Sequence, residues 1–307
     1  MKAVKVGSRV TVLYGGFSSE REVSLITGKQ VSSALRAMNY NVTMVDVPRD
    51  IKKMIGLIHE SKPDIVFNAL HGKFGEDGSV QGVLDMMRVP YTNSGRIASS
   101  IAMHKIFSKK IFSSIGLPVV QDHLLTLNDL QKNEPFSRPY VIKPFDEGSS
   151  VGVFIIKDDF DISSLRQFFS IDTNYLMAEE YIPGRELTVA VLGDKSLAVT
   201  EIQTRSDFYN YSAKYSPDGS SHILPAKLDK DIYNDLLDIS LLAHQSINCR
   251  GVSRVDFRLD GKNPYILEIN TQPGLTPTSL VPEQAAYVGI SFNDLILWMM
   301  ENAACDS

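Results

Sequence analysis

Hydrophobic and polar positions alternate in a regular rhythm over the first ninety or so residues. Three short, mostly apolar runs are typical of strands: residues 9–14, 41–47 and 64–70. After the first run, apolar residues recur at helical spacing to about residue 38, and after the second they do so over residues 51–60. Each of these segments is a predicted helix. Ser19 and Glu22 match a capping box at the start of the first helix. Strands that alternate with helices predict a parallel sheet with right-handed crossovers.

Ligands of such sheets collect where strands end and helices begin, and two segments lie there. Residues 15–20 follow the first strand but lack the glycine spacing of a dinucleotide fingerprint, which disfavours a nicotinamide or flavin enzyme. His71 follows the third strand, among glycines that allow close approach of a small ligand. A purely structural histidine is the alternative interpretation.

The hydrophobic pattern near the carboxyl end predicts a hairpin, residues 253–258 and 264–271, joined by a short turn. Because successive side chains of a strand point to opposite faces, Arg254, Asp256 and Arg258 share one face. Glu268 and Asn270 share a face of the next strand. Oxygen ligands of this kind suit Mg²⁺ held together with phosphates. The alternative is a solvated hairpin face.

The middle of the chain predicts further elements. A helix over residues 97–114 contains Lys105, and a strand over residues 139–144 contains Lys143 and leads into a Gly/Ser loop that can cover phosphates. Two strands flank Pro183-Gly184, and a long polar loop over residues 205–222 is typical of a lid. A helix over residues 230–247 precedes the hairpin, and two helices follow it.

Composition narrows the class of protein. The 307 residues are 43% hydrophobic and 22% charged, as in ordinary globular proteins with two or three domains, and the net charge of −5 gives no general attraction to nucleic acid. Two cysteines fit a reducing cytoplasm without a disulfide framework. We expect no signal peptide, because residues 1–5 lack an apolar core, and no membrane span.

Six motifs, in order along nearly the whole chain, resemble the D-alanine–D-alanine ligases. They are residues 15–24, 70–72, 143–144, 147–152, 209–215 and 268–274. The resemblance implies an α/β amino-terminal domain (1–95) with a parallel sheet, followed by an α+β ATP-grasp fold of two subdomains (96–178 and 179–307). It implies a cytoplasmic, dimeric, ADP-forming ligase that makes D-alanyl-D-alanine for peptidoglycan through a D-alanyl phosphate. ATP and D-alanine would be its partners, with two Mg²⁺ ions that Mn²⁺ can replace.

The resemblance also implies a role for each matching residue. ATP would contact Lys105, Lys143, Ser150, Glu179, Glu180, Ile182, Glu186, Tyr209 and Lys214. Metal ions would be held by Asp256, Glu268 and Asn270. The catalytic positions would be Glu20, Ser149, Tyr215, Arg254 and Gly274, and D-alanine would further contact His71, Ser279 and Leu280.

Two alternatives remain beside this interpretation. A related ligase could use D-lactate or D-serine as its second substrate, although Tyr215 is the residue type of dipeptide makers. A non-catalytic nucleotide-binding module is the other alternative. Against it stands the full set Glu20, Arg254, Asp256, Glu268 and Asn270, since binding alone would not need the oxyanion residues.

Overall fold

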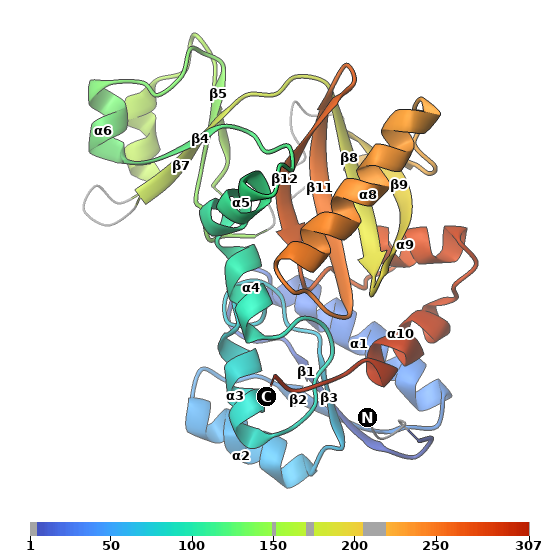
Figure 1. The fold of residues 1–307 in the computed structure, drawn as a ribbon. Helices are drawn as coiled ribbons and strands as arrows, with labels where there is room; N and C mark the ends of the chain where they lie inside the picture. The colour runs from blue at the N-terminus through green and yellow to red at the C-terminus, as the bar shows by residue number, and fades with distance from the viewer. Residues whose placement is uncertain (1–4, 149–151, 170–174, 205–218, 307) are drawn as a thin grey trace.

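Three separate sheets organise the chain, and each is built from its own stretch of sequence (Figure 1). The computed structural model describes residues 5–148, 152–169, 175–204 and 219–306. The first sheet lies at one end of the molecule, and the other two lie side by side at the opposite end (Figure 1).

The first sheet is parallel, as the sequence predicts, with strand order β2-β1-β3. Its elements are β1 (Arg9–Tyr14), α1 (Arg21–Ala37), β2 (Asn41–Asp46), α2 (Ile51–Ser61), β3 (Ile65–Asn68) and α3 (Ser79–Met87). Val12 packs toward α1, whereas Leu13 packs toward α2 and α3, because neighbouring residues of a strand face opposite sides. The carboxyl ends of β1 and β3 both point toward the rest of the molecule (Figure 1).

The second sheet is antiparallel, with strand order β4-β7-β5-β6. Its elements are β4 (Asp122–Thr126), α6 (Leu127–Lys132), β5 (Tyr140–Lys143), β6 (Phe154–Ile156), the short 3-10 helix η1 (Ile162–Gln167) and β7 (Tyr175–Glu180). The α6 helix and η1 pack on one face around Leu127, Tyr140 and Leu165, which are buried.

The third sheet is also antiparallel, with strand order β10-β9-β8-β11-β12. Its elements are β8 (Arg185–Leu192), β9 (Lys195–Thr204), β10 (Ser220–Ile223), α8 (Lys230–Ser246), β11 (Val252–Asp260) and β12 (Asn263–Asn270). The predicted hairpin is therefore confirmed, with α8 packed on one face of this sheet. The chain ends in α9 (Leu280–Tyr287) and α10 (Phe292–Glu301), and α10 returns to pack against α1 (Figure 1). Strands β7 and β8, which flank Pro183-Gly184, belong to different sheets.

The single helix predicted over residues 97–114 is wrong, because it is broken into α4 (Arg96–Met103) and α5 (Lys105–Ser114). His104 stands at the break with a non-helical backbone (φ −88°, ψ 87°). Its ring packs between Phe107 and Phe145, with ring centroids 4.0 and 4.5 Å away. The backbone N–H of Lys105 donates to the carbonyl of Phe145 (2.9 Å) instead of to its own helix. Packing against a distant loop thus overrides a continuous helical pattern.

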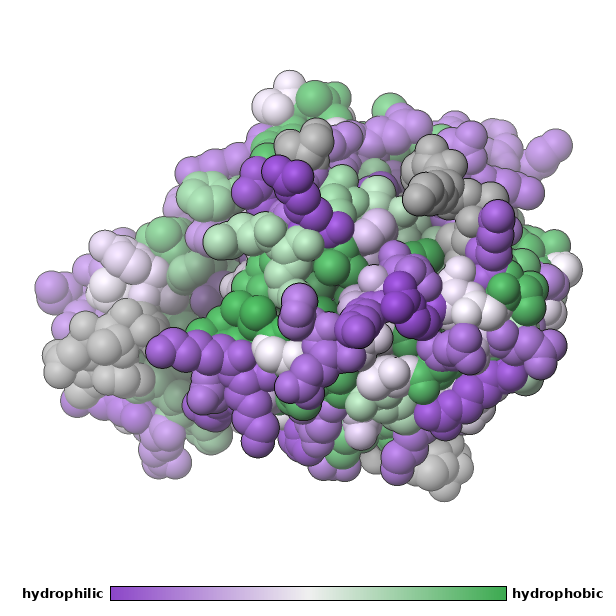
Figure 2. Space-filling model, turned by 90° about the horizontal axis from the view of Figure 1, so that it is seen from below, coloured by the Kyte–Doolittle hydropathy of each residue, from purple (hydrophilic) through white to green (hydrophobic). Residues whose placement is uncertain are grey.

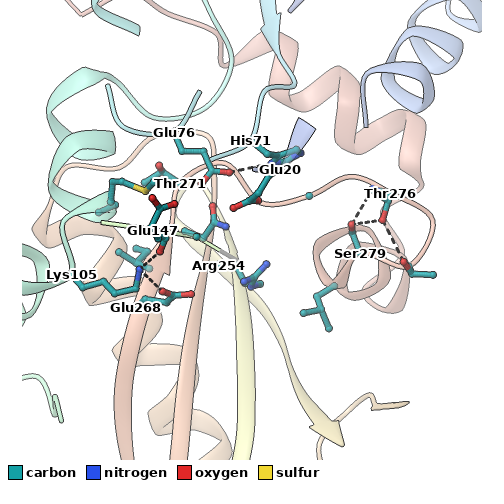
Figure 3. Close-up of a pocket in the computed structure, with 18 residues that line it drawn as sticks. Glu20, His71, Glu76, Lys105, Glu147, Arg254, Glu268, Thr271, Thr276 and Ser279 are labelled. Carbon is teal, nitrogen blue, oxygen red and sulfur yellow. Dashed lines mark hydrogen bonds and ion pairs between the residues drawn. The ribbon is translucent and has the colours of Figure 1, made fainter. Parts of the chain in front are cut away.

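The capping box predicted at Ser19 and Glu22 is also wrong. Glu20 is the residue at the cap of α1, and its side chain makes no capping hydrogen bond. Its backbone N–H donates instead to the hydroxyl of Ser18 (3.2 Å). The buried Glu20 carboxylate is consequently directed into a cavity (Figure 3).

Hydrophilic side chains predominate on the face seen from below the first sheet, with smaller apolar areas between them (Figure 2). Among the helices of the described residues, none is both long and apolar enough to cross a membrane.

Candidate active site

A polar cavity lies where the first sheet meets the edge of the third (Figure 3). Its lining comes from the segments after β1, β3 and β5, the junction of α4 and α5, the hairpin and the segment after it. The lining includes Glu20, His71, Glu76, Lys105, Glu147, Gly148, Arg254, Glu268, Asn270, Gly274, Thr276, Ser279 and Leu280. Segments far apart in the sequence therefore build one site.

One wall of this cavity is acidic. Glu20 and Glu76 are 4% and 7% exposed, and their carboxylates lie with a ring nitrogen of His71 within 4.8 Å of one another. Both ring nitrogens of His71 have partners: Nδ1 bonds Glu76 (3.1 Å), and Nε2 bonds the hydroxyl of Thr27 (3.0 Å). A side chain at position 148 would collide with the Glu20 carboxylate, so Gly148 lets the loop after β5 close over it. Two buried carboxylates in one wall suit an ammonium group, because opposite charges attract more strongly where water is excluded.

The hairpin supplies the second wall. Asp256 pairs with Glu268 and Arg254 with Asn270 across β11 and β12, so the predicted faces do coincide. The guanidinium of Arg254 holds Asp256 through two bonds of 2.8 and 2.7 Å. Asp256 also accepts a hydrogen bond from the hydroxyl of Thr188 (2.6 Å). Two carboxylates and an amide oxygen in register form an oxygen-only donor set that suits a hard divalent cation.

Lys105 connects the hairpin to the loop after β5. Its ammonium lies 3.0 Å from a carboxylate oxygen of Glu268 and donates to the carbonyl of Glu147 (2.6 Å). Burial acts to lower the pKa of Lys105, but the carboxylates of Glu268, Glu179 and Asp146 together outweigh burial and hold this pKa above its ordinary value. A lysine that the sequence pattern would place in solvent is thus a buried, fully charged donor.

A second cavity lies between the second and third sheets and shares Lys105, Glu147 and Glu268 with the first. Apolar side chains form much of its lining, and charged side chains form most of the rest. The lining includes Val141, Lys143, Val153, Ile155, Glu179, Glu180, Tyr181, Ile182, Glu186, Asp256, Arg258 and Leu267. Arg258 donates to the carbonyl of Ile182 (3.1 Å) and lies 3.5 Å from Glu186. A largely apolar lining with some polar groups is typical of sites for small molecules.

The segment after β12 is anchored to the first sheet. Gln272 is 3% exposed; its amide donates to the backbone carbonyl of Asn68 and accepts from the side chain of Asn93 (2.8 Å). Further along, Ser279 accepts a hydrogen bond from the backbone N–H of Thr276 (2.9 Å). A Cβ at Gly274 would come within 2.9 Å of the Ser279 hydroxyl, so a side chain here would displace that hydroxyl.

Two family models and full-length relatives match this chain. Residues 49–94 match the family model of the D-Ala-D-Ala ligase N-terminus, and residues 111–301 match that of the D-Ala-D-Ala ligase C-terminus. The D-alanine–D-alanine ligase of Rhodospirillum rubrum is 50% identical over 303 residues, which cover 98% of this chain and all of that protein. The chain belongs to the D-alanine–D-alanine ligase family.

Solved structures agree with this membership. The D-alanine–D-alanine ligase of Bacillus anthracis is 31% identical, with a TM-score of 0.83 over 96% of this chain and 97% of that one. The same ligase complexed with ATP has a TM-score of 0.82 at 30% identity, over 96% of each chain. The expected ATP-grasp arrangement behind a parallel α/β amino-terminal domain is therefore confirmed.

The residues that the family resemblance singles out gather at the two cavities. The first cavity is lined by Glu20, His71, Lys105, Arg254, Glu268, Asn270, Gly274, Ser279 and Leu280, and the second adds Lys143, Glu179, Glu180, Ile182, Glu186 and Asp256. The remaining predicted residues lie outside the described part of the chain: Ser149, Ser150, Tyr209, Lys214 and Tyr215.

Sequence reasoning misses three residues of this region. Glu76 lies in the glycine-rich segment after β3, five positions beyond His71. Lys109 is buried beside Glu179, four positions beyond Lys105 and hence on the same side of α5. The hairpin pattern places Arg258 on the same face as Arg254 but gives it no role. The i, i+4 spacing of two lysines is the one available signal for Lys109.

Proposed function

We propose that this chain joins two D-alanine molecules into D-alanyl-D-alanine, a peptidoglycan precursor, and converts ATP to ADP and phosphate. The observation that carries the proposal is the shared edge of the two cavities. Lys105, Glu147 and Glu268 line both of them, so a nucleotide in one cavity can present its terminal phosphate to an amino acid in the other. The family membership supports the identity of both substrates.

The reaction proceeds in two steps. A carboxylate oxygen of the first D-alanine attacks the γ-phosphorus of ATP, the bond to the β-phosphate oxygen breaks, and ADP leaves. The resulting D-alanyl phosphate is then attacked by the neutral amine of the second D-alanine. The attacking nitrogen gives up one proton to water, the tetrahedral intermediate collapses, phosphate leaves with the electrons of the C–O bond, and the amide bond remains.

The acidic wall, the hairpin and the segment after it contact different parts of the two D-alanine molecules. Glu20 holds the ammonium of the first D-alanine, because it is a buried carboxylate that faces the cavity. Arg254 and the backbone N–H of Gly274 face the oxyanion of the tetrahedral intermediate, a contact typically worth about 3–4 kcal/mol per donor. Ser279 and Leu280, at the start of α9, bind the carboxylate of the second D-alanine. His71, with both nitrogens occupied, holds Glu76 in place beside Glu20.

The nucleotide lies in the second cavity in this proposal. Lys105 and Lys143 neutralise phosphates, the apolar walls near Ile182 enclose the adenine, and Glu186 accepts the ribose hydroxyls. Ser149, Ser150, Tyr209, Lys214 and Tyr215, which lie outside the described residues, keep the roles that the resemblance implies, in the phosphate loop and the lid.

Asp256, Glu268 and Asn270 would hold two Mg²⁺ ions, for which Mn²⁺ can substitute. The donor set supports this assignment, since its oxygen ligands are in register and lie beside Lys105 at the shared edge. When bound, the ions supply positive charge that offsets the charge of the triphosphate.

We also propose a cytoplasmic homodimer. A reducing compartment is supported by Cys249 and Cys305, which are unpaired with each other. The division into residues 1–95, 96–178 and 179–307 is supported by one sheet in each range, although β7 crosses the second boundary. Light scattering at two protein concentrations would test the dimer.

Phosphate release in the presence of ATP and Mg²⁺ tests the proposed function. Separate reactions contain D-alanine, L-alanine, D-serine, or D-alanine with D-lactate, and mass spectrometry identifies each product. We expect D-alanine alone to support rapid release and to yield D-alanyl-D-alanine. Release with L-alanine but not D-alanine would contradict the proposal, and a D-alanyl-D-lactate product in preference to the dipeptide would assign a depsipeptide ligase.

A further inference from the structure

Lys109 is a fully buried cation that lines neither cavity. It lies on α5, one turn after Lys105, and is 1% exposed. Its ammonium lies 2.6 Å from a carboxylate oxygen of Glu179 and 3.1 Å from one of Asp122. Burying an ammonium group is unfavourable unless it is paired, so these contacts are the reason that Lys109 can occupy this place.

The two carboxylates stand directly opposite each other. Asp122 of β4 pairs with Glu179 of β7 in the antiparallel register. Like charges in this position repel and destabilise a sheet. Lys109 of α5 bonds both carboxylates, so its positive charge offsets the repulsion between them.

Glu179 also contacts a second lysine, Lys143, which lines the second cavity. One carboxylate oxygen bonds Lys109, and the other bonds Lys143. Burial acts to raise the pKa of Glu179, but Lys143 and Lys109 outweigh burial and hold it below the ordinary value. Burial among other ammonium groups instead lowers the pKa of Lys143. Lys143 can therefore exchange its contact with Glu179 for a phosphate while Lys109 still compensates the carboxylate.

We propose that Lys109 is a positioning residue that selects adenine over other purines through Glu179. It fixes Glu179 as an oriented, charged acceptor for the exocyclic amine of adenine when Lys143 turns to the phosphates. A purine with a carbonyl at that position would present an acceptor to the carboxylate and be repelled. This inference rests on the proposed placement of ATP in the second cavity.

The test compares ATP with inosine triphosphate, which carries a carbonyl in place of the amine, in wild type, K109M and the control K110M. Lys110 is the next residue on the same helix and is exposed. We expect K109M to raise the KM for ATP about tenfold, as for the loss of one charge-assisted hydrogen bond. The KM for inosine triphosphate and kcat should change less than about twofold. K110M should match wild type.

For each variant, the KM for ATP and the KM for inosine triphosphate are measured on one preparation. The ratio of the two KM values therefore stays valid even when part of the protein is inactive. If K109M is insoluble, E179Q and K109M/E179Q carry the test, because the double variant lacks the uncompensated carboxylate. We expect these two to show the same reduced preference for ATP, since Lys109 acts through Glu179.

Three results would overturn the inference: an unchanged preference in K109M, an equal rise in KM for both nucleotides, or a further loss of preference in the double variant beyond E179Q. A wild type that uses ATP and inosine triphosphate equally would also overturn it, because there would be no preference for Lys109 to support. Absence of phosphate release from ATP with D-alanine would instead remove the proposed function on which the inference rests.

Discussion

Asp256 stands directly opposite Glu268 across β11 and β12, at the shared edge of the two cavities. The repulsion between these carboxylates is relieved by Arg254 on one side and Lys105 on the other. The sheet therefore presents two paired acids at the point where phosphate transfer is proposed, and a cation of β11 and a cation of α5 offset their repulsion.

Replacing Glu268 by Gln should lower kcat at least about 100-fold, because the proposed metal site loses a charged ligand while the side-chain volume is kept. Thermal unfolding should shift by only a few degrees. Steady-state kinetics over a range of Mg²⁺ concentrations check the prediction, and the apparent Mg²⁺ requirement should rise. Asp260→Asn, at the exposed tip of the same hairpin, is the matched control and should behave as wild type. Near-normal turnover in a folded Glu268→Gln enzyme would instead leave this carboxylate as a solvated hairpin side chain.

Replacing Glu20 by Gln should raise the KM for D-alanine roughly tenfold or more, because the substrate ammonium loses a charged partner. The KM for ATP should change little, since Glu20 lines the first cavity and not the second. Initial rates with each substrate varied in turn measure both constants. Glu22→Gln, exposed on α1, serves as the control. Equal changes in both constants would argue for a structural effect of Glu20.

Replacing Gln272 by Ala should reduce the free energy of unfolding by about 1–3 kcal/mol, because polar atoms of Asn68 and Asn93 lose a buried partner. We also expect a lower kcat, since the segment that carries Gly274 loses its anchor on β3. Urea unfolding and steady-state kinetics are the measurements, with exposed Gln245→Ala as the control. Loss of stability without loss of kcat would confine Gln272 to a structural role.

The pKa of His244 predicts how the free energy of unfolding depends on pH. Burial lowers its pKa to about 4 from the ordinary 6.5, and its ring bonds the hydroxyl of Ser253 (2.7 Å). Between these values the unfolded chain binds a proton that the folded chain excludes, so stability must fall as the pH falls from about 6.5 toward 4. From pH 7 to pH 5 this group should account for about 2 kcal/mol.

Urea unfolding at the two pH values tests the assignment. His244→Gln should lower stability at pH 7 but show a loss between pH 7 and pH 5 that is smaller by about 2 kcal/mol than in wild type. His59→Gln, exposed on α2, should retain the wild-type loss. An identical pH dependence in wild type and His244→Gln would show that His244 does not set it.

The sequence by itself determined the parallel sheet, the hairpin and the family. Alternation of side chains around a short turn is a local property, and it is enough to predict that Asp256 and Glu268 lie on neighbouring strands of one hairpin. The six ordered motifs identify the chemistry, because close approach to a ligand restricts which residues a loop can contain.

Only the tertiary structure decided which charges are buried and what they contact. The helical pattern continues through His104, but Phe145, forty-one positions away, competes for the Lys105 backbone and breaks the helix. Lys109 looks like any surface lysine of an amphipathic helix. It is buried because Asp122 and Glu179, brought together by pairing of β4 and β7, supply the two carboxylates that make burial of its ammonium tolerable.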